Sequence, residues 1–372
     1  MIHALAADRA HIADFDAQIE DLERTLAVLR NERALVQERL DSYRYPVLTL
    51  PHEIICEIFI HFLPAYPARP PLTGPRSPIL LTQICAGWRK ISLAFPLLWR
   101  AIELSSDGPA WLLSVVLGRS GSSPLSICVD ELNGSSDDER GLVSAILPYR
   151  ERWQYLSLDL TGGPDPGYPS IGGPMPLLQH LELKLDDARG WPGFSLAEAP
   201  LLHTAIVSYF AAMRVILPWT QLTSLTLEGM YLREGFPILQ QAANLVRCEL
   251  EICDFRWTSS DRVDVALPSL ESLTLFFPAW DMDTYKHNYL QAFITPALSR
   301  LEIPERFLGP DPIHSLSSFI LKSRCKLQRV QIVGQRLVHK RSYRTAFPSI
   351  QMFFTGSYVD DGGEDSDSEG SS

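Results

Sequence analysis

The sequence predicts an α/β protein built from three parts: a long N-terminal coiled-coil helix, a small all-α module, and a solenoid whose strands form a curved parallel sheet with helical connections. Three observations lead to this prediction. Apolar residues follow a heptad pattern near the N-terminus, two apolar helical segments flank a proline-rich stretch, and an L-x-x-L-x-L motif recurs through the remaining chain. With 372 residues, of which 46% are hydrophobic, the chain is long enough for several units that each bury a core.

The first part is a helix predicted for residues 12–45, with Pro46 at its end. Its apolar residues recur at alternating steps of three and four, broken once at Arg33, which is the a/d spacing of a coiled coil. They are Ile12, Phe15, Ile19, Leu22, Leu26, Leu29, Val36, Leu40 and Tyr43. Two interpretations remain open: this seam joins two parallel copies of residues 12–43 in a homodimer, or one amphipathic helix folds back on its own chain.

Two apolar segments follow, and both are predicted to be helical. Pro51 suits the first turn of a helix, where its missing N–H is not needed, and an apolar stripe continues from there to Leu63. A second helix is predicted from Leu81 to Phe95, followed by the sequence Leu-Leu-Trp after a proline. The six prolines of residues 64–78 exclude a helix between the two segments.

The order of anchors in this region resembles an F-box. The sequence reads L-P-x-E-I-…-I-F, then I-C-x-x-W-R-x-I, then L-W, over residues 48–102, and its proline-rich insertion is similar to those of the large fungal F-box families. The resemblance implies a helical module that binds the Skp-type linker protein of cullin–RING ubiquitin ligases. It assigns linker binding to Leu50, Pro51, Glu53, Ile54, Ile58, Phe59, Ile84, Cys85 and Trp88. The alternative is an ordinary two-helix core in which the tryptophans only pack.

The third part consists of L-x-x-L-x-L motifs at intervals of 20–29 residues. Their last positions are Leu158, Leu183, Val207, Leu227, Leu250, Leu275, Ile303 and Ile332. Alternate residues of a strand share one face, so each motif buries its leucines on one side and needs neighbours to cover them. Further strands are predicted at 102–104 and 127–129, and helical connections at 109–118, 139–147, 237–244 and 312–322. The pattern resembles an irregular leucine-rich-repeat horseshoe; an unrelated α/β sheet is the alternative.

The residues between the leucines are predicted to line the open face of the sheet. In the late repeats three arginines share one outward column, two glutamates lie in the next column, and a phenylalanine lies one position further on. The residues that we assign to binding of a protein target are Arg247, Glu249, Phe276, Arg300, Glu302 and Arg329. The alternative is cross-strand charge pairing that only keeps the sheet soluble.

Charge and cysteine content restrict the partners and the compartment. The net charge is -11, and six acids fall between Asp360 and Glu369, which leaves -11 + 6 = -5 for the rest of the chain. This acidic balance argues against binding to nucleic acids or membranes. No apolar run is long enough to span a membrane. The six cysteines show no metal-ligand spacing, which predicts reduced thiols in an intracellular protein, cytoplasmic or nuclear.

The expected function is that of an adaptor and not of an enzyme, because no phosphate-binding, metal-binding or nucleophile motif occurs and no cofactor is implied. The predicted domains are the coiled-coil helix at 1–45, the F-box at 46–100, the repeats at 101–356 and a disordered acidic tail at 357–372. The F-box would bind the linker of a cullin–RING ligase, and the repeats would bind an unknown protein substrate. The alternative is a leucine-rich-repeat scaffold that dimerises through its coiled coil and has no ligase activity.

Overall fold

The computed structural model describes residues 2–42, 46–104, 110–129, 142–160, 169–185, 193–253, 264–278 and 288–358. The chain divides into two compact units, Met1–Phe59 and Ile60–Ser372. The division falls inside the region predicted to be an F-box, and each unit is described by itself. The predicted α/β class is confirmed, because the chain combines a long N-terminal helix with a parallel sheet of 11 strands.

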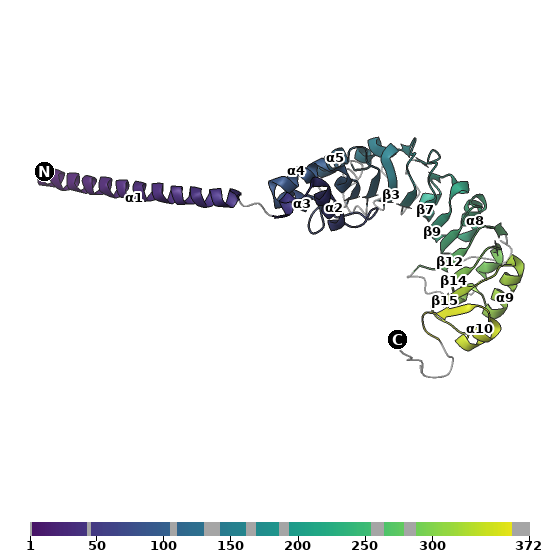
Figure 1. The fold of residues 1–372 in the computed structure, drawn as a ribbon. Coiled ribbons are helices and arrows are strands. Elements are labelled where there is room, and N and C mark those ends of the chain that lie inside the picture. Colours follow the sequence, from purple (N-terminus) through teal and green to yellow (C-terminus); the bar gives the residue numbers. More distant parts are fainter. Residues whose placement is uncertain are drawn as a thin grey trace. The chain divides into compact units, whose positions relative to one another are not determined.

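The first unit begins with one uninterrupted helix, α1 (Ile2–Ser42), drawn in purple in Figure 1. This helix starts ten residues earlier than the heptad pattern predicted. Residues 2–11 lack the heptad seam but contain four alanines, and alanine has the highest helix propensity. A 3-10 helix, η1 (Pro46–Thr49), and the beginning of α2 (His52–Phe62) complete the unit.

The predicted coiled-coil seam is exposed along α1. Each of the eight described seam residues is exposed, from 45% at Leu26 to 68% at Leu22. The ninth seam residue, Tyr43, lies outside the described residues. In the isolated chain, α1 therefore presents an apolar stripe to solvent that is interrupted only at Arg33.

The second unit begins with three short helices: α3 (Pro78–Ile84), α4 (Ala86–Ala94) and the 3-10 helix η2 (Pro96–Trp99). The single helix predicted from Leu81 to Phe95 is wrong, because the chain is extended at Cys85 with φ -156°. The Cys85 thiol accepts a hydrogen bond from the Trp88 amide at 3.4 Å and so caps α4. As predicted, the proline-rich residues 64–77 contain no helix.

The main sheet of the second unit is entirely parallel, and its strands follow one another in chain order. Its strands are β1 (Ala101–Leu104), β2 (Leu125–Val129), β3 (Trp153–Leu160), β5 (His180–Leu185), β7 (Thr204–Ser208), β9 (Ser224–Met230), β10 (Arg247–Ile252), β12 (Ser272–Phe276), β14 (Arg300–Pro304), β15 (Arg329–Val333) and β16 (Gln351–Phe354). Every predicted repeat strand is present, and β16 is an additional strand. Within this unit the strands follow an arc, with α8, α9 and α10 on its outer side (Figure 1).

The core of the sheet follows from the alternation in the motif. The last motif positions, such as Leu227, Leu250 and Leu275, pair with one another across adjacent strands and are fully buried. The residues between them point to the opposite face and are mostly half-buried or exposed. The connections cover one face of the sheet. The opposite face, which we call the open face, carries the residues between the leucines.

Short connections link the strands on the buried side. They are α5 (Ala110–Arg119), η3 (Leu147–Arg152), α7 (Tyr209–Ala212), η4 (Trp219–Gln221), α8 (Leu232–Gln241), η6 (Tyr289–Ala292), η7 (Glu305–Phe307), α9 (Pro312–Ser323) and α10 (Lys340–Ala346). Two small sheets pair β4 (Ile171–Gly172), β6 (Phe194–Ser195) and β8 (Val215–Ile216), and β11 (Val265–Ala266) and β13 (Phe293–Ile294).

The predicted connections were right in kind and partly wrong in extent. Helices α5 and α9 match the predicted ranges 109–118 and 312–322, apart from residue 109, which is not described. The helix predicted at 237–244 begins at Leu232 instead, because Leu232, Phe236 and Leu239 form its buried stripe and Pro237 lies inside it. Residues 142–146 of the predicted helix at 139–147 are helical, and residues 139–141 lie outside the described residues.

Candidate protein-interaction surfaces

An apolar stripe on the first unit is exposed where α2 begins. Ile54 and Ile58 are spaced by four residues and share one face of α2, and Leu50 lies just before this helix. The three side chains are 47%, 40% and 36% exposed. Pro51 and Glu53, at the start of the same helix, are exposed as well. The structure thus leaves five of the residues assigned to linker binding accessible on one short segment.

The opposite face of α2 is buried, and this changes the assignment of one residue. The resemblance places Phe59 on the linker surface, but its side chain is 0% exposed. Phe59 follows Ile55 by four residues and lies on the same buried face of α2. Ile58, one residue earlier, lies on the exposed face. Phe59 is therefore a core residue of the chain and is removed from the accessible surface.

In the second unit, α3 also carries an exposed apolar pair. Leu80 and Ile84 are separated by four residues and are exposed, while Leu81 beside them is buried. The other two assigned residues, Cys85 and Trp88, are half-buried. The Cys85 thiol caps α4, so this side chain stabilises the helix within its own chain. Of the three residues assigned here, only Ile84 is a largely exposed apolar side chain.

Hydrogen bonds fix α3 and α4 against each other and against η2. Arg89 donates from Nε to the carbonyl of Thr82 at 2.8 Å, which links the two helices. The buried Trp99 donates from Nε1 to the carbonyl of Ser92, also at 2.8 Å. Each bond satisfies a backbone carbonyl near the end of a helix, where intrahelical partners are lacking. These hydrogen bonds therefore fix the orientation of α3, whose exposed face carries Leu80 and Ile84.

The proline-rich segment lies on the open face of the first strands. Tyr66 donates from its hydroxyl to the Gln154 side chain on β3 at 2.7 Å. Arg69 donates to the hydroxyl of Ser126 on β2 at 3.2 Å, and that hydroxyl donates to the carbonyl of Pro67 at 2.8 Å. These contacts join segments far apart in sequence, and they cover the polar face of β2 and β3.

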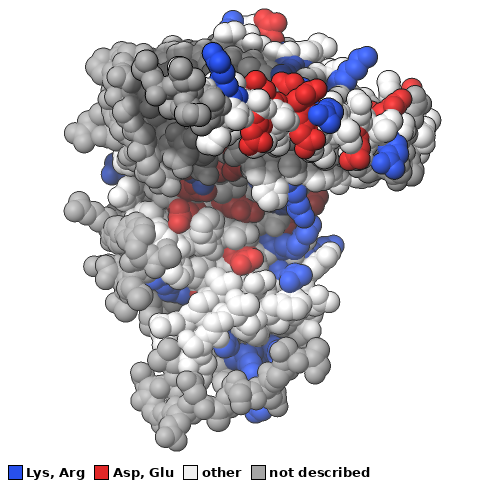
Figure 2. All heavy atoms as spheres, turned by 90° about the vertical axis from the view of Figure 1, so that its left-hand side faces the viewer, with Lys and Arg blue, Asp and Glu red and all other residues white. Residues whose placement is uncertain are grey.

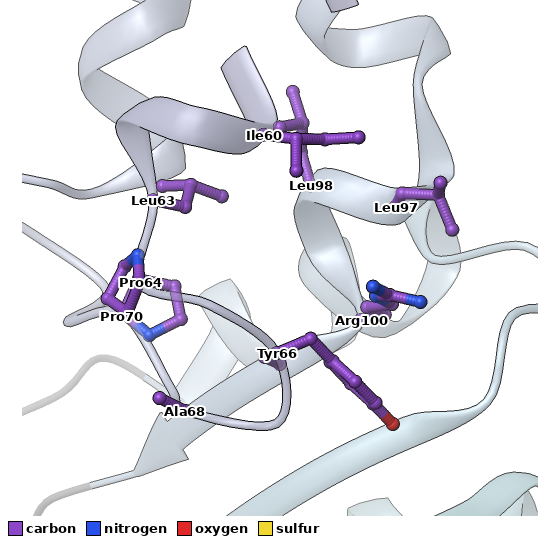
Figure 3. A pocket seen from close by; sticks show the side chains of 10 residues that line it. Ile60, Leu63, Pro64, Tyr66, Ala68, Pro70, Leu97, Leu98 and Arg100 are labelled. Atoms are coloured by element: carbon purple, nitrogen blue, oxygen red, sulfur yellow. The ribbon is translucent and has the colours of Figure 1, made fainter. Parts of the chain in front are cut away.

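Tyr66 is the centre of this contact. Its ring lies 3.9 Å below the Arg100 guanidinium carbon, and Figure 3 shows both side chains at the edge of a small pocket. Burial, opposed by the nearby Arg100 charge, raises the pKa of Tyr66 to about 12. The pocket has a volume of about 30 Å³, far below the roughly 300 Å³ of a typical small-molecule site. This contact therefore joins two parts of the chain and does not form a ligand site.

The middle of the open face carries a network of charged side chains. Lys184 on β5 forms ion pairs with Glu182 at 3.3 Å and with Glu228 on β9 at 3.1 Å. The hydroxyl of Ser157 donates to Glu182 at 2.9 Å. Burial alone would raise the pKa of Glu182, but the Ser157 hydroxyl and Lys184 outweigh it and leave that pKa below its usual value. Lys184 thus pairs with both glutamates of this network.

A bulge between β9 and β10 places a third acid, Glu251, beside this network. The register shifts after Leu250, where Gly229 adopts φ +65°, a conformation that favours glycine. The Gly229 amide donates to the Glu251 carboxylate at 2.9 Å. Burial, partly offset by this amide and reinforced by the charge of Glu228, raises the pKa of Glu251.

The late strands carry the arginine column that the sequence predicted. Arg247 pairs in register with Ser272, Ser272 with Arg300, and Arg300 with Arg329. Glu249 and Glu302 occupy the adjacent column in the same way. All three arginines are exposed. The predicted positions on the open face are therefore correct for these five residues.

The alternative of cross-strand charge pairing does not describe this region. In the part of the chain that the structure describes, neither Arg247, Arg300 nor Arg329 forms an ion pair with a carboxylate. Arg329 instead lies over the ring of Phe353 on β16, 4.3 Å from its centre. Phe276, half-buried, is opposite Glu251 in the register. In the described ranges, the late strands thus present guanidinium groups without a carboxylate partner beside accessible aromatic rings.

Sequence reasoning missed two features of these surfaces. The contact of Tyr66 and Arg69 with the sheet was not predicted, although an aromatic and a basic residue within a proline-rich stretch were a usable signal. Phe353 was missed because β16 lacks the leucine motif. Its neighbour Met352 is buried and Phe353 is exposed, so the strand still alternates.

No known family identifies these surfaces. Comparison with models of protein families gave no match to this chain, and comparison with curated proteins gave none. Among the described residues, no three His, Cys, Asp or Glu side chains are grouped so that they could hold a metal ion. No helix in the described ranges is long and apolar enough to cross a membrane.

Proposed function

We propose that the chain is a non-catalytic substrate adaptor of a Skp–cullin–F-box ubiquitin ligase. The observation that carries the proposal is the exposed stripe of Leu50, Ile54 and Ile58, which follows the Leu-Pro pair at the positions that the F-box resemblance assigns to the linker. Within the described chain these three side chains are only partly covered. Large side chains left exposed at regular helical spacing are typical of a face that binds a partner.

Burial of the remaining exposed surface of Leu50, Ile54 and Ile58 would stabilise a complex with a partner protein. Full burial of one aliphatic side chain stabilises a complex by about 1.5–3 kcal/mol, and each of these side chains is already more than half covered. The resemblance separately assigns Ile84 of the second unit to the linker, and its aliphatic side chain is exposed. Glu53 and Pro51 at the rim contribute orientation more than affinity.

We further propose that the 11-stranded sheet is a divergent leucine-rich-repeat solenoid that binds the target on its open face. The proline-rich segment already occupies that face at β2 and β3 through Tyr66 and Arg69. In the middle strands, Lys184 already forms ion pairs with Glu182 and Glu228. The uncompensated arginines and the phenylalanines of the late strands are therefore the proposed target surface, because arginine and aromatic residues are enriched in interface hot spots.

Co-purification with the Skp-type linker tests this function. The full chain, co-expressed with the linker and the cullin amino-terminal region, is expected to elute with both on size exclusion. A matched pair of variants distinguishes the proposed face from general stickiness. Ile58→Asp removes the complex, whereas Leu321→Asp on α9, which changes the most exposed apolar side chain, leaves it intact. A wild-type chain that elutes alone contradicts the proposal.

A second candidate function is a scaffold that dimerises through α1 and has no ligase partner. The exposed seam from Ile12 to Leu40 favours this candidate, because an apolar stripe of that length is covered by a second helix in most proteins. Both candidate functions are compatible with a dimer formed through α1. They differ in linker binding, so the co-purification separates them.

A further inference from the structure

The end of the chain separates its charges by sign. Residues 324–358 contain no Asp or Glu and seven basic residues, and the next residues contain six acids. The basic residues are Arg324, Lys326, Arg329, Arg336, Lys340, Arg341 and Arg344. Among the described residues on the lowest part of the surface visible in Figure 2, where Figure 1 places β15 and α10, the side chains coloured as charged are Lys and Arg.

Three of these arginines surround the last strand, β16. Arg329 lies over the Phe353 ring at 4.3 Å, and Arg336 and Arg344 lie 5.1 and 5.8 Å from the centre of the Phe354 ring. A guanidinium stacked on a ring keeps its N–H edge free, and that edge matches the two oxygens of a carboxylate. Phe353 lies on the open face of β16 and Phe354 on the opposite face, beside Tyr343 of α10. We call these three arginines and two phenylalanines, which flank both sides of the edge strand, the arginine–phenylalanine cluster.

Arg336 is an independent sign that an anion belongs here. Its side chain is 7% exposed, and its Nε has no hydrogen-bond partner in the described part of the chain. A buried charged donor without a partner is costly, and proteins satisfy such groups in most cases. Glu305, the acid buried nearby, directs its carboxylate to two backbone amides and to Tyr343 instead.

The course of the chain brings an acidic segment to this cluster. Tyr358, the last described residue, forms a parallel bridge with Arg336, and the Arg336 amide donates to the carbonyl of Ser357 at 3.0 Å. Asp360 follows two residues later, and a residue spans at most about 3.6 Å. The first acid is therefore tethered within about 7 Å of Tyr358, which gives an effective concentration on the order of millimolar.

We propose that the acidic segment Asp360–Glu369 docks in cis on the arginine–phenylalanine cluster. Carboxylates of this segment accept hydrogen bonds from Arg329, Arg336 and Arg344. Docking withdraws Arg329 from the arginine column, so the segment competes with any acidic target for the end of the open face. The inference does not depend on the ligase proposal, because it concerns only residues after Arg324.

The test uses two full-length chains and one labelled peptide that comprises residues 359–372. In the neutral-tail variant, Asp360, Asp361, Asp365 and Asp367 become Asn, and Glu364 and Glu369 become Gln. The peptide is expected to bind the neutral-tail variant at least tenfold more tightly than wild type, because the wild-type segment already occupies the cluster. The binding is expected to weaken steeply as salt increases.

Charge reversal locates the binding site. In the neutral-tail background, Arg329→Glu with Arg344→Glu is expected to abolish peptide binding. The control Arg247→Glu, an exposed arginine on β10 in the same column, is expected to leave it unchanged. Equal peptide affinity for wild type and the neutral-tail variant overturns the proposal. So does equal loss of binding in the control, which would indicate attraction to any basic surface.

Discussion

The hydroxyl of Tyr343 donates a hydrogen bond to the carboxylate of Glu305, with 3.0 Å between the two oxygens, and both side chains are buried. The other carboxylate oxygen accepts from the amides of Leu337 and Val338, at 2.6 and 3.1 Å. One acid after β14 thus holds the loop after β15 and helix α10. This contact secures the last strands, which carry the proposed target surface.

The Tyr343→Phe substitution is expected to destabilise the chain by about 1.5–3 kcal/mol, the range for a hydrogen bond to a charged group. It leaves the Glu305 carboxylate buried with one donor fewer. Urea denaturation at neutral pH measures the loss. The control Tyr231→Phe removes a hydroxyl from an exposed tyrosine and is expected to change stability by less than about 0.5 kcal/mol. Equal effects of the two substitutions would contradict this role of Tyr343.

The same contact predicts a pH dependence. Burial, with the charge of Glu305, raises the pKa of Tyr343 above its usual value of about 10. The folded chain therefore holds this proton more tightly than the unfolded chain. The contribution to stability is complete below pH about 10 and is lost as the pH rises above that value. We expect a shallower alkaline decline in Tyr343→Phe; Tyr66 and Tyr209, with a pKa raised to about 12, keep part of the slope.

The contact of Tyr66 with β3 predicts that the proline-rich segment detaches when its anchor is lost. Tyr66→Ala removes the hydrogen bond to Gln154 and the stacking under Arg100, so protease cleavage within residues 64–77 should accelerate at least tenfold. Thr73→Ala, an exposed change in the same segment, serves as the control. Unchanged cleavage in Tyr66→Ala would mean that other contacts hold the segment.

The arginine column predicts loss of target binding without loss of stability. The triple variant with Arg247, Arg300 and Arg329 changed to Glu is expected to keep its melting temperature within a few degrees, because these exposed side chains form no ion pairs in the described residues. Proteins that co-precipitate with wild type should be lost. A charge-matched control changes Arg233, Lys326 and Arg341, all exposed, to Glu. Retention of every target by the triple variant would place recognition elsewhere.

The exposed seam of α1 predicts a dimer in solution. Sedimentation equilibrium of the full chain should give twice the monomer mass at micromolar concentration. Leu22→Asp with Leu29→Asp places charges in the seam and should weaken the dimer at least tenfold, whereas Arg24→Asp with Asn31→Asp, at outward positions, should not. A wild-type chain that stays monomeric at high micromolar concentration would leave the seam without this role.

Features that depend on local alternation could be predicted from the sequence. Each L-x-x-L-x-L motif fixes which side chains are buried, and equal motifs stack in equal register. The column of Arg247, Arg300 and Arg329 therefore followed from counting positions. The F-box resemblance, and not helical spacing alone, assigned Leu50, Ile54 and Ile58 to the accessible side, and all three side chains are exposed.

Features that depend on contacts distant in sequence could not be predicted. The extended backbone at Cys85 depends on its thiol capping α4, an uncommon role for cysteine. The burial of Phe59 depends on which face of α2 is covered, and periodicity shows two apolar faces without ranking them. Tyr66 and Gln154 are 88 residues apart, so no local pattern connects them.

Affinity for the Skp-type linker tests the central claim most directly. Calorimetric titration of the purified full chain should give a dissociation constant in the micromolar range or below, with Ile54→Asp and Ile58→Asp each weakening binding at least a hundredfold, about 2.7 kcal/mol. Leu321→Asp should bind as wild type does, and circular dichroism should show that all three variants are folded. Wild-type heat no larger than that of dilution, or equal affinity for Ile58→Asp and Leu321→Asp, would contradict the assignment of this stripe to a ligase adaptor.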